Sequence, residues 1–360
     1  MTDKKIRLLI IDDSAYNRKA ISEFFINHPN VEIVGKAADG QEGLQMALNL
    51  NPSVITLDLE MPRLDGFGFL RLLMSGQPTP VIVISSHGEK ENVFRALELG
   101  ALDFVAKPSV MISPAIYNIK DDVVQKVLAA GKFNLEALST LSRGAPATGM
   151  TALPSEPPKE LIGIKDAPAT NVVALGASTG GPASITKVLC GLPEHLDAAI
   201  VIAQHMPAQF TASFAKRLDR LTPMRVVEMQ ASEVLRNGSV YITPGDGDLM
   251  FSKVAEGYMV KKVSLSDKCR YAPCIDRMFV SAAQTVGEKL LGVILTGMGD
   301  DGTRGCAEIY NAGGTLLVES EETAIVYGMP KAVVEAGIPA KVRPLHMIAA
   351  VISTFGRPHH

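Results

Sequence analysis

Asn171-Val-Val-Ala-Leu-Gly-Ala-Ser-Thr-Gly-Gly-Pro182 is an apolar run that ends in a glycine-rich turn carrying a serine. Its first residues are short and β-branched, which favours a buried β-strand, and Gly176, Gly180 and Gly181 permit a sharp turn into a helix. Ser178 is therefore expected at the carboxyl end of a strand in an α/β sheet. The spacing Gly-x-Ser-x-Gly fits a nucleophile elbow. The same turn also suits a phosphate-binding loop or a plain strand-to-helix connection, so three interpretations stay open.

The composition predicts a soluble protein of two domains. The chain has 360 residues, which is enough for two separate cores. It is 47% hydrophobic and 20% charged, and no apolar run approaches the roughly 18 residues of a membrane span. The first residues lack the long apolar region of a secretory signal, so we expect a cytoplasmic protein that does not insert into the membrane. A formal net charge of −3 gives no overall attraction to nucleic acid.

Cysteine spacing gives little support for a metal site in this chain. No two cysteines form a Cys-x-x-Cys pair, so we expect small buried side chains rather than metal ligands. The terminal pair His359-His360 is compatible with a native tail or with a tag remnant. The cysteines are Cys190, Cys269, Cys274 and Cys306.

Apolar strand-like runs alternate with helical patterns in the first 130 residues, which predicts a parallel α/β sheet. Because parallel strands end at the same edge, the polar residues that follow these runs are expected to converge. Carboxylates that share one crevice repel each other unless a cation is bound, and Mg²⁺ suits such oxygen ligands. A single strand-end aspartate is more often a solvated turn residue. The converging set is Asp12 and Asp13 after residues 7–11, Asp58 after residues 53–57, Ser85 after residues 81–84, and Lys107 after residues 103–106.

Residues 6 to about 130 resemble a response-regulator receiver domain. The resemblance rests on Asp12-Asp13, on Asp58-Leu-Glu-Met-Pro62, on Ser85 and on Lys107-Pro108. It implies a flavodoxin-like, doubly wound fold in which Asp58 accepts a phosphoryl group from a histidine kinase. It further implies an Mg²⁺ site and a set of switch residues. The implied metal ligands are Asp12, Asp13, Asp58 and the Glu60 backbone carbonyl, and the implied switch residues are Ser85, Phe104 and Lys107.

The character of the chain changes after a helix that is expected over residues 118–138. Residues 142–170 contain prolines at 146, 154, 157, 158 and 168, small polar residues and little periodicity. We interpret them as a flexible linker with a root-mean-square span of about 30 Å. The expected division is therefore a receiver domain at 1–141, a linker at 142–170 and a second domain at 171–360.

In the second domain, polar motifs again follow apolar strand-like runs. Ser178 follows residues 172–175, His205 follows residues 198–204, and Asp300-Asp301 come after residues 291–296. Convergence of the strand ends would assemble a serine, an imidazole and a carboxylate, which are the groups that acyl transfer needs. The order Ser, His, Asp differs from that of the α/β-hydrolases. The residues alone do not choose between Asp300 and Asp301 as the acid.

Residues 171 to about 350 resemble the catalytic domain of the chemotaxis protein-glutamate methylesterases, and the order receiver, linker, esterase matches that family over nearly the whole chain. The matching motifs are Gly176-Ala-Ser-Thr-Gly-Gly181, Gln204-His-Met-Pro207 and Leu295-Thr-Gly-Met-Gly-Asp-Asp-Gly302. The resemblance implies a hydrolase that needs no cofactor at this site. It implies the nucleophile Ser178, the base His205, the orienting acid Asp301, and the Met298 backbone amide as an oxyanion-hole donor.

The same resemblance implies a substrate and partners. The implied reactions are demethylation of glutamate methyl esters and deamidation of glutamines on the cytoplasmic helices of methyl-accepting chemotaxis receptors. They would serve adaptation in chemotaxis or in a related chemosensory pathway. Both reactions pass through attack at an acyl carbon and a tetrahedral oxyanion, so one site can perform both.

Three residues depart from the pattern of that family. Asp300 stands where asparagine is usual, Asp248 where histidine is common, and Cys274 where serine is common. Asp300 adds a negative charge beside the triad acid, which is expected to favour the protonated form of His205. None of the three replaces a triad residue, so we expect activity to persist.

Two other functions share some of these features. The glycine turn resembles that of short-chain dehydrogenases, and Tyr258-x-x-x-Lys262 has the spacing of their catalytic tyrosine and lysine. In those enzymes the tyrosine and lysine lie on a helix, whereas residues 257–264 alternate like a hairpin strand. A receiver with a DNA-binding output is disfavoured because no basic helix-turn-helix pattern follows the linker. The sequence therefore predicts an α/β hydrolase built from two doubly wound parallel-sheet domains.

Overall fold

The chain divides into two compact units, Met1–Leu138 and Ser139–His360. The computed structural model describes residues 5–85, 90–107, 114–131, 167–267 and 269–355. Pro108, His359-His360 and residues 142–166 of the predicted linker lie outside this description. No helix among the described residues is long and apolar enough to cross a membrane.

The first unit contains a five-stranded sheet in the order β2-β1-β3-β4-β5, and every neighbouring pair is parallel. Leu8, Leu9 and Ile10 in the interior strand β1 are fully buried, as expected for a sheet covered on both faces. The predicted parallel fold is confirmed. The strands are β1 (Ile6–Ile11), β2 (Val31–Ala37), β3 (Val54–Leu57), β4 (Val81–Ser85) and β5 (Asp103–Ala106).

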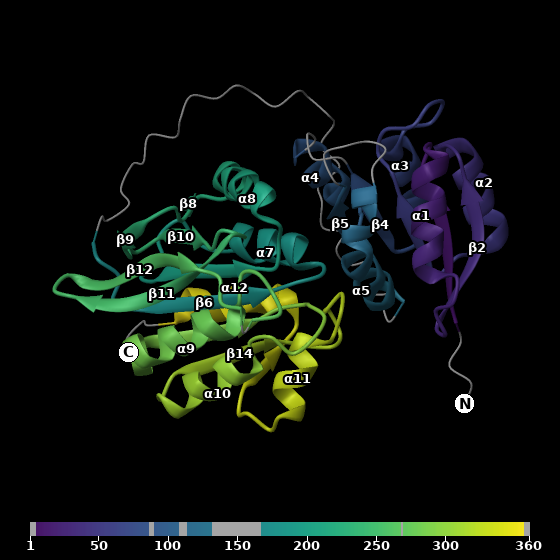
Figure 1. Cartoon of the computed structure of the whole chain (residues 1–360). Coiled ribbons are helices and arrows are strands. Elements are labelled where there is room, and N and C mark those ends of the chain that lie inside the picture. The colour runs from purple at the N-terminus through teal and green to yellow at the C-terminus, as the bar shows by residue number, and fades with distance from the viewer. Residues whose placement is uncertain (1–4, 86–89, 108–113, 132–166, 268, 356–360) are drawn as a thin grey trace. The chain divides into compact units, whose positions relative to one another are not determined.

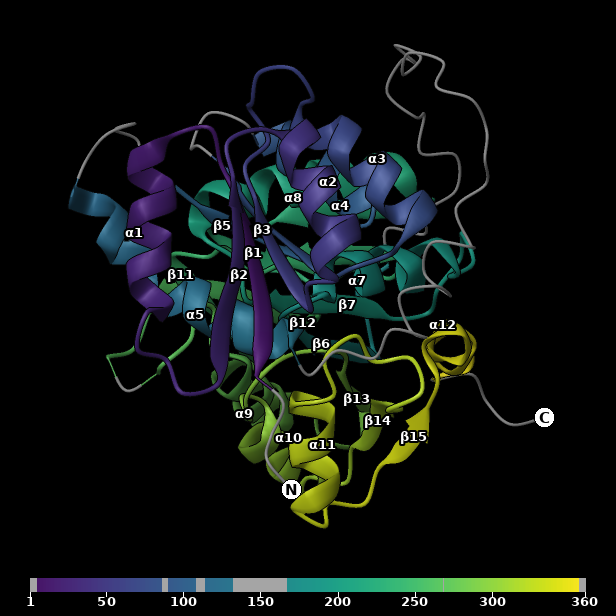
Figure 2. The same ribbon diagram turned by 90° about the vertical axis from the view of Figure 1, so that its right-hand side faces the viewer.

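Helices cover both faces of this sheet, with α1 and α5 on one side and α2, α3 and α4 on the other (Figure 2). Ser14, Asp39 and Asp65 cap the first three helices with side-chain oxygens, which satisfies backbone N–H groups that lack partners within the helix. Of the helix predicted over residues 118–138, the described part is α5, and residues 132–138 lie outside the description. The helices are α1 (Ala15–Phe25), α2 (Gly40–Leu50), α3 (Gly66–Gly76), α4 (Lys90–Glu98), the 3-10 helix η1 (Pro114–Ile119) and α5 (Lys120–Ala130).

The second unit contains a seven-stranded parallel sheet in the order β15-β14-β13-β6-β7-β10-β8. The strand β6 lies between β13 and β7, and all its residues are buried. The segments that follow β6, β7 and β13 therefore leave the sheet side by side at one edge. The strands are β6 (Val172–Ala177), β7 (Ala199–Gln204), β8 (Arg225–Glu228), β10 (Ser239–Ile242), β13 (Leu290–Ile294), β14 (Thr315–Glu319) and β15 (Lys341–Arg343).

Helices also cover both faces of the seven-stranded sheet. Figure 1 shows α7 and α8 on one face and α9 and α10 on the other. Leu290 and Ile294 of β13 join Met278 and Phe279 of α9 in one buried apolar cluster. The helices are α7 (Gly181–Cys190), α8 (Ala208–Leu221), α9 (Ile275–Val286), the 3-10 helix η2 (Gly287–Lys289), α10 (Thr303–Asn311), α11 (Met329–Glu335) and α12 (Leu345–Thr354).

A three-stranded antiparallel sheet, in the order β11-β12-β9, adds to the predicted parallel architecture. Its strands are β9 (Ser232–Val234), β11 (Gly247–Val254) and β12 (Gly257–Ser264). The hairpin strand predicted at residues 257–264 is confirmed, because β12 pairs antiparallel with β11 along its whole length. Tyr258 and Lys262 thus lie on a strand, which argues against the dehydrogenase interpretation.

Residues 167–169, which precede β6, are attached to the second unit by backbone hydrogen bonds. Ala169 N–H donates to Leu235 O at 2.8 Å, and Asn237 N–H donates to Ala167 O at 3.1 Å. Ala169 is fully buried. Residues 167–169 therefore pack against the connection between β9 and β10, while the domain limits at 141 and 171 stay predictions.

Candidate active site

Ser178 directly follows β6, in a turn that backbone hydrogen bonds define. Ser178 N–H donates to Thr296 O at 3.0 Å, and Gly181 N–H donates to Ser178 O at 2.7 Å. Gly180 has φ 77°, a left-handed conformation that favours glycine, and α7 begins immediately after it. A Cβ atom on Gly297 would lie 2.8 Å from Ser178 Cβ, so only glycine allows this loop to approach the serine. The expected strand-turn-helix geometry is present.

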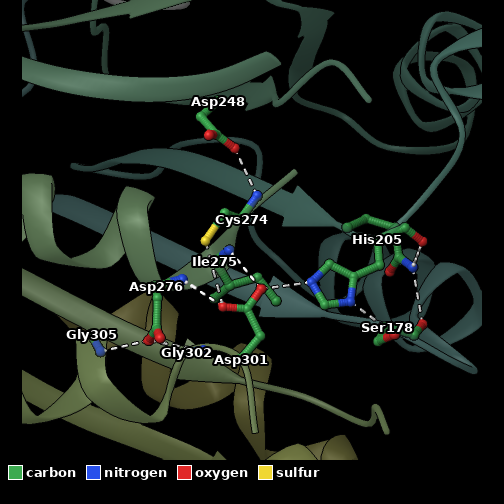
Figure 3. Close-up of polar contacts among 10 residues, drawn as sticks. Ser178, His205, Asp248, Cys274, Ile275, Asp276, Asp301, Gly302 and Gly305 are labelled. Atoms are coloured by element: carbon green, nitrogen blue, oxygen red, sulfur yellow. Dashed lines mark hydrogen bonds and ion pairs between the residues drawn. The ribbon is translucent and has the colours of Figure 1, made fainter. Parts of the chain in front are cut away.

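His205 follows β7 and lies between Ser178 and Asp301 (Figure 3). His205 Nδ1 is 3.1 Å from Ser178 Oγ, and His205 Nε2 is 2.8 Å from Asp301 Oδ2. The tautomer with a proton on Nε2 donates to the carboxylate and leaves Nδ1 as an acceptor for the serine proton. The side chains that the sequence placed at separate strand ends therefore form one connected chain of polar contacts.

Asp301, rather than Asp300, contacts the imidazole. Asp301 is buried and its Oδ2 also accepts Ile275 N–H at 2.9 Å, whereas Asp300 is exposed. Although burial opposes ionisation, hydrogen bonds from His205 and from the first amides of α9 lower the pKa of Asp301. A carboxylate held in its charged form is suited to orienting an imidazole and to stabilising an imidazolium.

Sequence analysis missed two residues that hold this group of side chains. The Tyr271 ring stacks on the His205 ring with a centroid distance of 4.8 Å and an interplanar angle of 11°. The buried Gln204 side chain donates from Nε2 to Ser178 O at 2.9 Å and to His205 O at 3.0 Å. Gln204 lies within a quoted motif, but its bridging role depends on the adjacent strands, and nothing in the sequence distinguished Tyr271.

The loop that follows β13 also carries Met298, the predicted oxyanion-hole donor. Gly297 N–H donates to Val326 O at 3.0 Å, and Gly297 O accepts Met329 N–H at 2.8 Å, so the start of this loop is fixed beside Ser178. Within the described part of the chain, the Met298 N–H donates to no protein acceptor. An amide without an intramolecular partner is a requirement for an oxyanion donor. The role of Met298 stays a prediction.

In the first unit, the carboxylates of Asp12, Asp13 and Asp58 lie within 4.8 Å of one another. Lys107 Nζ is 2.9 Å from Asp12 Oδ2 and also contacts Asp58 Oδ2. Burial raises the pKa of Asp58 to about 6; Lys107 opposes this rise, and the neighbouring aspartates add to it. A divalent cation would relieve this clustering of acidic oxygens, so the residues fit the predicted Mg²⁺ site.

The other predicted receiver residues lie on β4, on β5 and in the connection that follows β3. Ser85 ends β4 and accepts the Lys107 N–H through its backbone oxygen at 2.7 Å. Phe104 is buried in β5, and Lys126 Nζ lies 5.5 Å from the centre of its ring. Glu60 lies in the connection between β3 and α3, and metal binding by its backbone carbonyl stays a prediction.

Two of the departures from the family pattern meet at the start of α9. Asp248 is fully buried, accepts Cys274 N–H at 2.7 Å and pairs with Arg277. Cys274 Sγ lies 3.8 Å from Asp301 Oδ1. Asp248 and Cys274 thus support the start of α9, whose amides donate to Asp301, and Asp248 has a basic partner for its charge.

The expectation of buried cysteines is only partly correct. Cys274 and Cys306 are buried, but Cys190 is exposed and Cys269 is intermediate. Cys190 is the last residue of α7, and its thiol donates to Leu221 O at 3.5 Å. Among the described residues, no cysteine takes part in a potential metal-binding cluster.

The fully buried Glu319 ends β14 and is linked through Thr296 to the turn that carries Ser178. Its Oε2 accepts Thr296 N–H at 2.8 Å, and its Oε1 accepts the Thr323 hydroxyl at 3.1 Å. Thr296 in turn accepts Ser178 N–H and donates from Oγ1 to Thr179 O at 2.9 Å. Burial raises the pKa of Glu319 from 4.5 to about 7, so this carboxyl is held neutral below neutral pH.

Glu319→Gln is expected to make the protein more stable than the parent at pH 8. In the folded parent, Glu319 keeps its proton up to about pH 7, whereas in the unfolded chain it loses the proton above pH 4.5. The free energy of unfolding of the parent therefore falls by about 3 kcal/mol as pH rises from 4.5 to about 7. Glutamine cannot ionise and escapes this loss. Thermal unfolding at pH 5 and pH 8 measures the difference. An advantage of Glu319→Gln that does not grow with pH, or that also appears in the exposed control Glu308→Gln, would contradict the assignment.

The chain matches two family models, a response regulator receiver domain over residues 8–112 and the CheB methylesterase over residues 173–352. A protein-glutamate methylesterase/protein-glutamine glutaminase 3 from Geobacter sulfurreducens is 43% identical over 359 residues, with 97% of each chain covered. A protein-glutamate methylesterase/protein-glutamine glutaminase 1 from Myxococcus xanthus is 42% identical, with 98% of this chain and 97% of the relative covered. The crystal structure of the Thermotoga maritima CheB methylesterase catalytic domain is 37% identical at a TM-score of 0.49, covering 51% of this chain and 96% of that one. The chain therefore belongs to the CheB methylesterase family, with a response regulator receiver domain preceding the methylesterase domain.

Proposed function

We propose that this protein is a phosphorylation-regulated hydrolase that demethylates glutamate methyl esters, and deamidates glutamines, on the cytoplasmic domains of chemoreceptors. The relatives reported above carry both activities in their names. The observation that carries the proposal is the chain of contacts from Ser178 Oγ through His205 to Asp301. The protein would act in the cytoplasm in chemotaxis or a related chemosensory pathway, without binding nucleic acid or inserting into the membrane.

The proposed reaction begins with attack by Ser178 Oγ on the acyl carbon while His205 Nδ1 takes the hydroxyl proton. Asp301 stabilises the resulting imidazolium through Nε2, and the Met298 amide donates to the tetrahedral oxyanion. Collapse expels methanol, or ammonia from glutamine, which takes the proton from His205. A water molecule, deprotonated by the same imidazole, then attacks the acyl carbon; His205 returns this proton to Ser178 Oγ as the bond to serine breaks and the glutamate is released. Each proton transfer is assigned to a residue of the chain, so we propose no cofactor for this reaction.

In the receiver unit, Asp58 would accept the phosphoryl group from a histidine kinase. Asp12, Asp13, Asp58 and the Glu60 carbonyl would hold Mg²⁺, which when bound neutralises charge on the phosphoryl oxygens. Lys107 already contacts Asp12 and Asp58, so its ammonium is positioned for a phosphoryl oxygen. We assign the phosphorylation-dependent switch to Ser85, Phe104 and Lys107.

Methanol release from a methylated chemoreceptor fragment tests the function. The intact protein is expected to release methanol from the fragment and to convert its target glutamines to glutamate. A folded protein that does neither, with or without a phosphodonor, would contradict the proposal. Binding of a nicotinamide nucleotide or of DNA would instead favour one of the two other functions that share sequence features.

A fragment that starts near residue 165 is expected to hydrolyse receptor esters faster than the unphosphorylated intact protein. A receiver tethered by about 30 residues of linker has an effective concentration of order millimolar near the hydrolase, so docking with a Kd of about 0.1 mM would occlude roughly nine-tenths of the sites. The fragment would then be about tenfold more active. Initial rates on the same receptor fragment measure this ratio.

Phosphorylation provides the control for this experiment. A phosphoryl group carries about 1.5 to 2 negative charges and replaces the single carboxylate charge of Asp58, which should weaken the docked state. A small phosphodonor should therefore raise the rate of the intact protein and leave the fragment unchanged. A fragment that is folded by circular dichroism but slower than the unphosphorylated parent would exclude inhibition by occlusion. Phosphorylation would then act only by stimulation.

A further inference from the structure

Asp276, in the first turn of α9, is bonded to the loop that carries the triad acid. Asp276 N–H donates to Asp301 Oδ1 at 2.9 Å. In return, Asp276 Oδ1 accepts Gly302 N–H at 3.1 Å and Gly305 N–H at 2.7 Å, as Figure 3 shows. The Asp301 side chain therefore binds the backbone at Asp276, at the start of α9. The Asp276 side chain binds the backbone that follows Asp301, at the start of α10.

This exchange supplies the N-terminal cap of both helices. The N-cap residue of α9 is Cys274 and that of α10 is Gly302, and neither makes a side-chain capping bond. The first N–H groups of a helix lack partners within the helix, and a carboxylate beside them is favoured by the helix dipole. Asp301 caps α9 and Asp276 caps α10, so the position of the triad acid depends on the contact between the two helices.

The two helices approach closely where these caps lie. A Cβ atom on Gly305 would lie 2.4 Å from Phe279 Cβ, so α10 packs directly against α9. The loop from β13 to α10 carries Met298 and Asp301, and it ends at the amides held by Asp276. Release of these amides would free the end of the loop immediately after Asp301.

The bonding pattern at Asp276 separates its two carboxylate oxygens. Oδ1 receives both amides, while Oδ2 lies 3.8 Å from Arg304 Nε near the surface. Burial raises the pKa of Asp276, and the charge of Asp301 adds to the rise. An asparagine can present the same Oδ1 acceptor without charge, so acceptor geometry and charge can be tested separately.

We propose that Asp276 is a positioning residue for the hydrolase: it holds the Gly302 and Gly305 amides and so keeps the Asp301 carboxylate facing His205. Asp276 acts through Asp301, which immediately precedes Gly302 and directly contacts the imidazole. Displacement of a catalytic group by about 1 Å can cost about 10²-fold in rate. The kinetic part of this inference rests on the proposed function.

Three full-length variants test the assignment against the parent and Ser178→Ala. Asp276→Ala removes the acceptor and is expected to lower kcat for receptor demethylation about 10- to 100-fold, with KM within about twofold. Asp276→Asn retains the Oδ1 acceptor and is expected to recover most of the parental kcat. Arg304→Ala removes only the Oδ2 partner and is expected to match the parent. Equal kcat for Asp276→Ala and the parent would overturn the proposal, as would an equal loss in Asp276→Asn and Asp276→Ala.

A spectroscopic measurement tests the same inference without turnover. The proton between His205 Nε2 and Asp301 should give a downfield NMR resonance that His205→Gln removes. We expect this resonance to be lost in Asp276→Ala and kept in Asp276→Asn and Arg304→Ala. If the parent shows no serine-dependent methanol release, the proposed function fails, and the resonance alone decides the role of Asp276. An unchanged resonance in Asp276→Ala would refute the positioning role.

Discussion

Ser178→Ala is expected to lower methanol release from a methylated receptor fragment by at least about 10³-fold while the protein stays folded. The substitution removes the oxygen that lies 3.1 Å from His205 Nδ1 and leaves the backbone bonds of the turn in place. His205→Gln should cause a loss of similar size, because without the imidazole the serine proton has no acceptor. The double variant should be no slower than either single variant, since the residues act as a unit. Near-parental release by a folded Ser178→Ala protein would refute the mechanism.

A pair of adjacent aspartates gives the matched control for this mechanism. Asp301→Asn should lower turnover at least about 10²-fold, because the amide cannot supply the charge that stabilises the imidazolium. Asp300→Asn should match the parent, because Asp300 is exposed and the carboxylate that contacts the imidazole is that of Asp301. The reverse ranking would show that the acid has been assigned to the wrong residue.

Asp58→Asn is expected to abolish labelling of the protein by a small phosphodonor such as acetyl phosphate in the presence of Mg²⁺. The carboxylate of Asp58 is the proposed acceptor, and an amide oxygen in its place is a far weaker nucleophile. Phosphate incorporation, read by the mass of the intact protein or by gel mobility with a phosphate-binding additive, measures the effect. Acid-stable labelling that persists in Asp58→Asn would mean that the acceptor is a different residue.

Asp12 and Asp13 provide the test of the metal requirement. The double variant Asp12→Asn/Asp13→Asn should be labelled slowly, because it removes two of the three carboxylates that cluster within 4.8 Å. A matched exposed variant, Asp121→Asn on α5, should be labelled at the parental rate. Fast labelling of the double variant that does not depend on Mg²⁺ would contradict the assigned ligands.

The candidate site residues that sequence analysis predicted share one local signal. Each is a polar residue at the end of an apolar, strand-like run, as Ser178 is after β6 and His205 after β7. Period and residue type over five or six positions are enough to predict such a strand, and parallel connectivity brings the strand ends to one edge. The same reasoning predicted Asp12, Asp58 and Lys107 in the first unit.

The elements that sequence analysis did not describe lack this signal. The edge strand β15 (Lys341–Arg343) is short and exposed along its length, and β9 (Ser232–Val234) has three residues without a fully buried side chain. Such strands are stabilised by hydrogen bonds to a neighbour that is distant in the sequence, such as β14 for β15 and β12 for β9. A short stretch of sequence does not indicate which distant strand will pair with it.

The sequence by itself determined the two α/β units and the edge at which Ser178 and His205 meet, because strand periodicity, glycine turns and parallel connections are local properties with a defined spatial consequence. The residues alone left Asp300 and Asp301 open and the family resemblance implied Asp301; the tertiary structure gives the physical reason, because the Asp301 carboxylate reaches the free amides of α9. Only the tertiary structure identified Asp276 and Glu319, whose bonds to Gly302 and Thr296 join segments more than 20 residues apart. Burial and hydrogen-bond geometry of this kind arise only when helices and strands pack. Here they hold the serine, the imidazole and the carboxylate within hydrogen-bonding distance of one another.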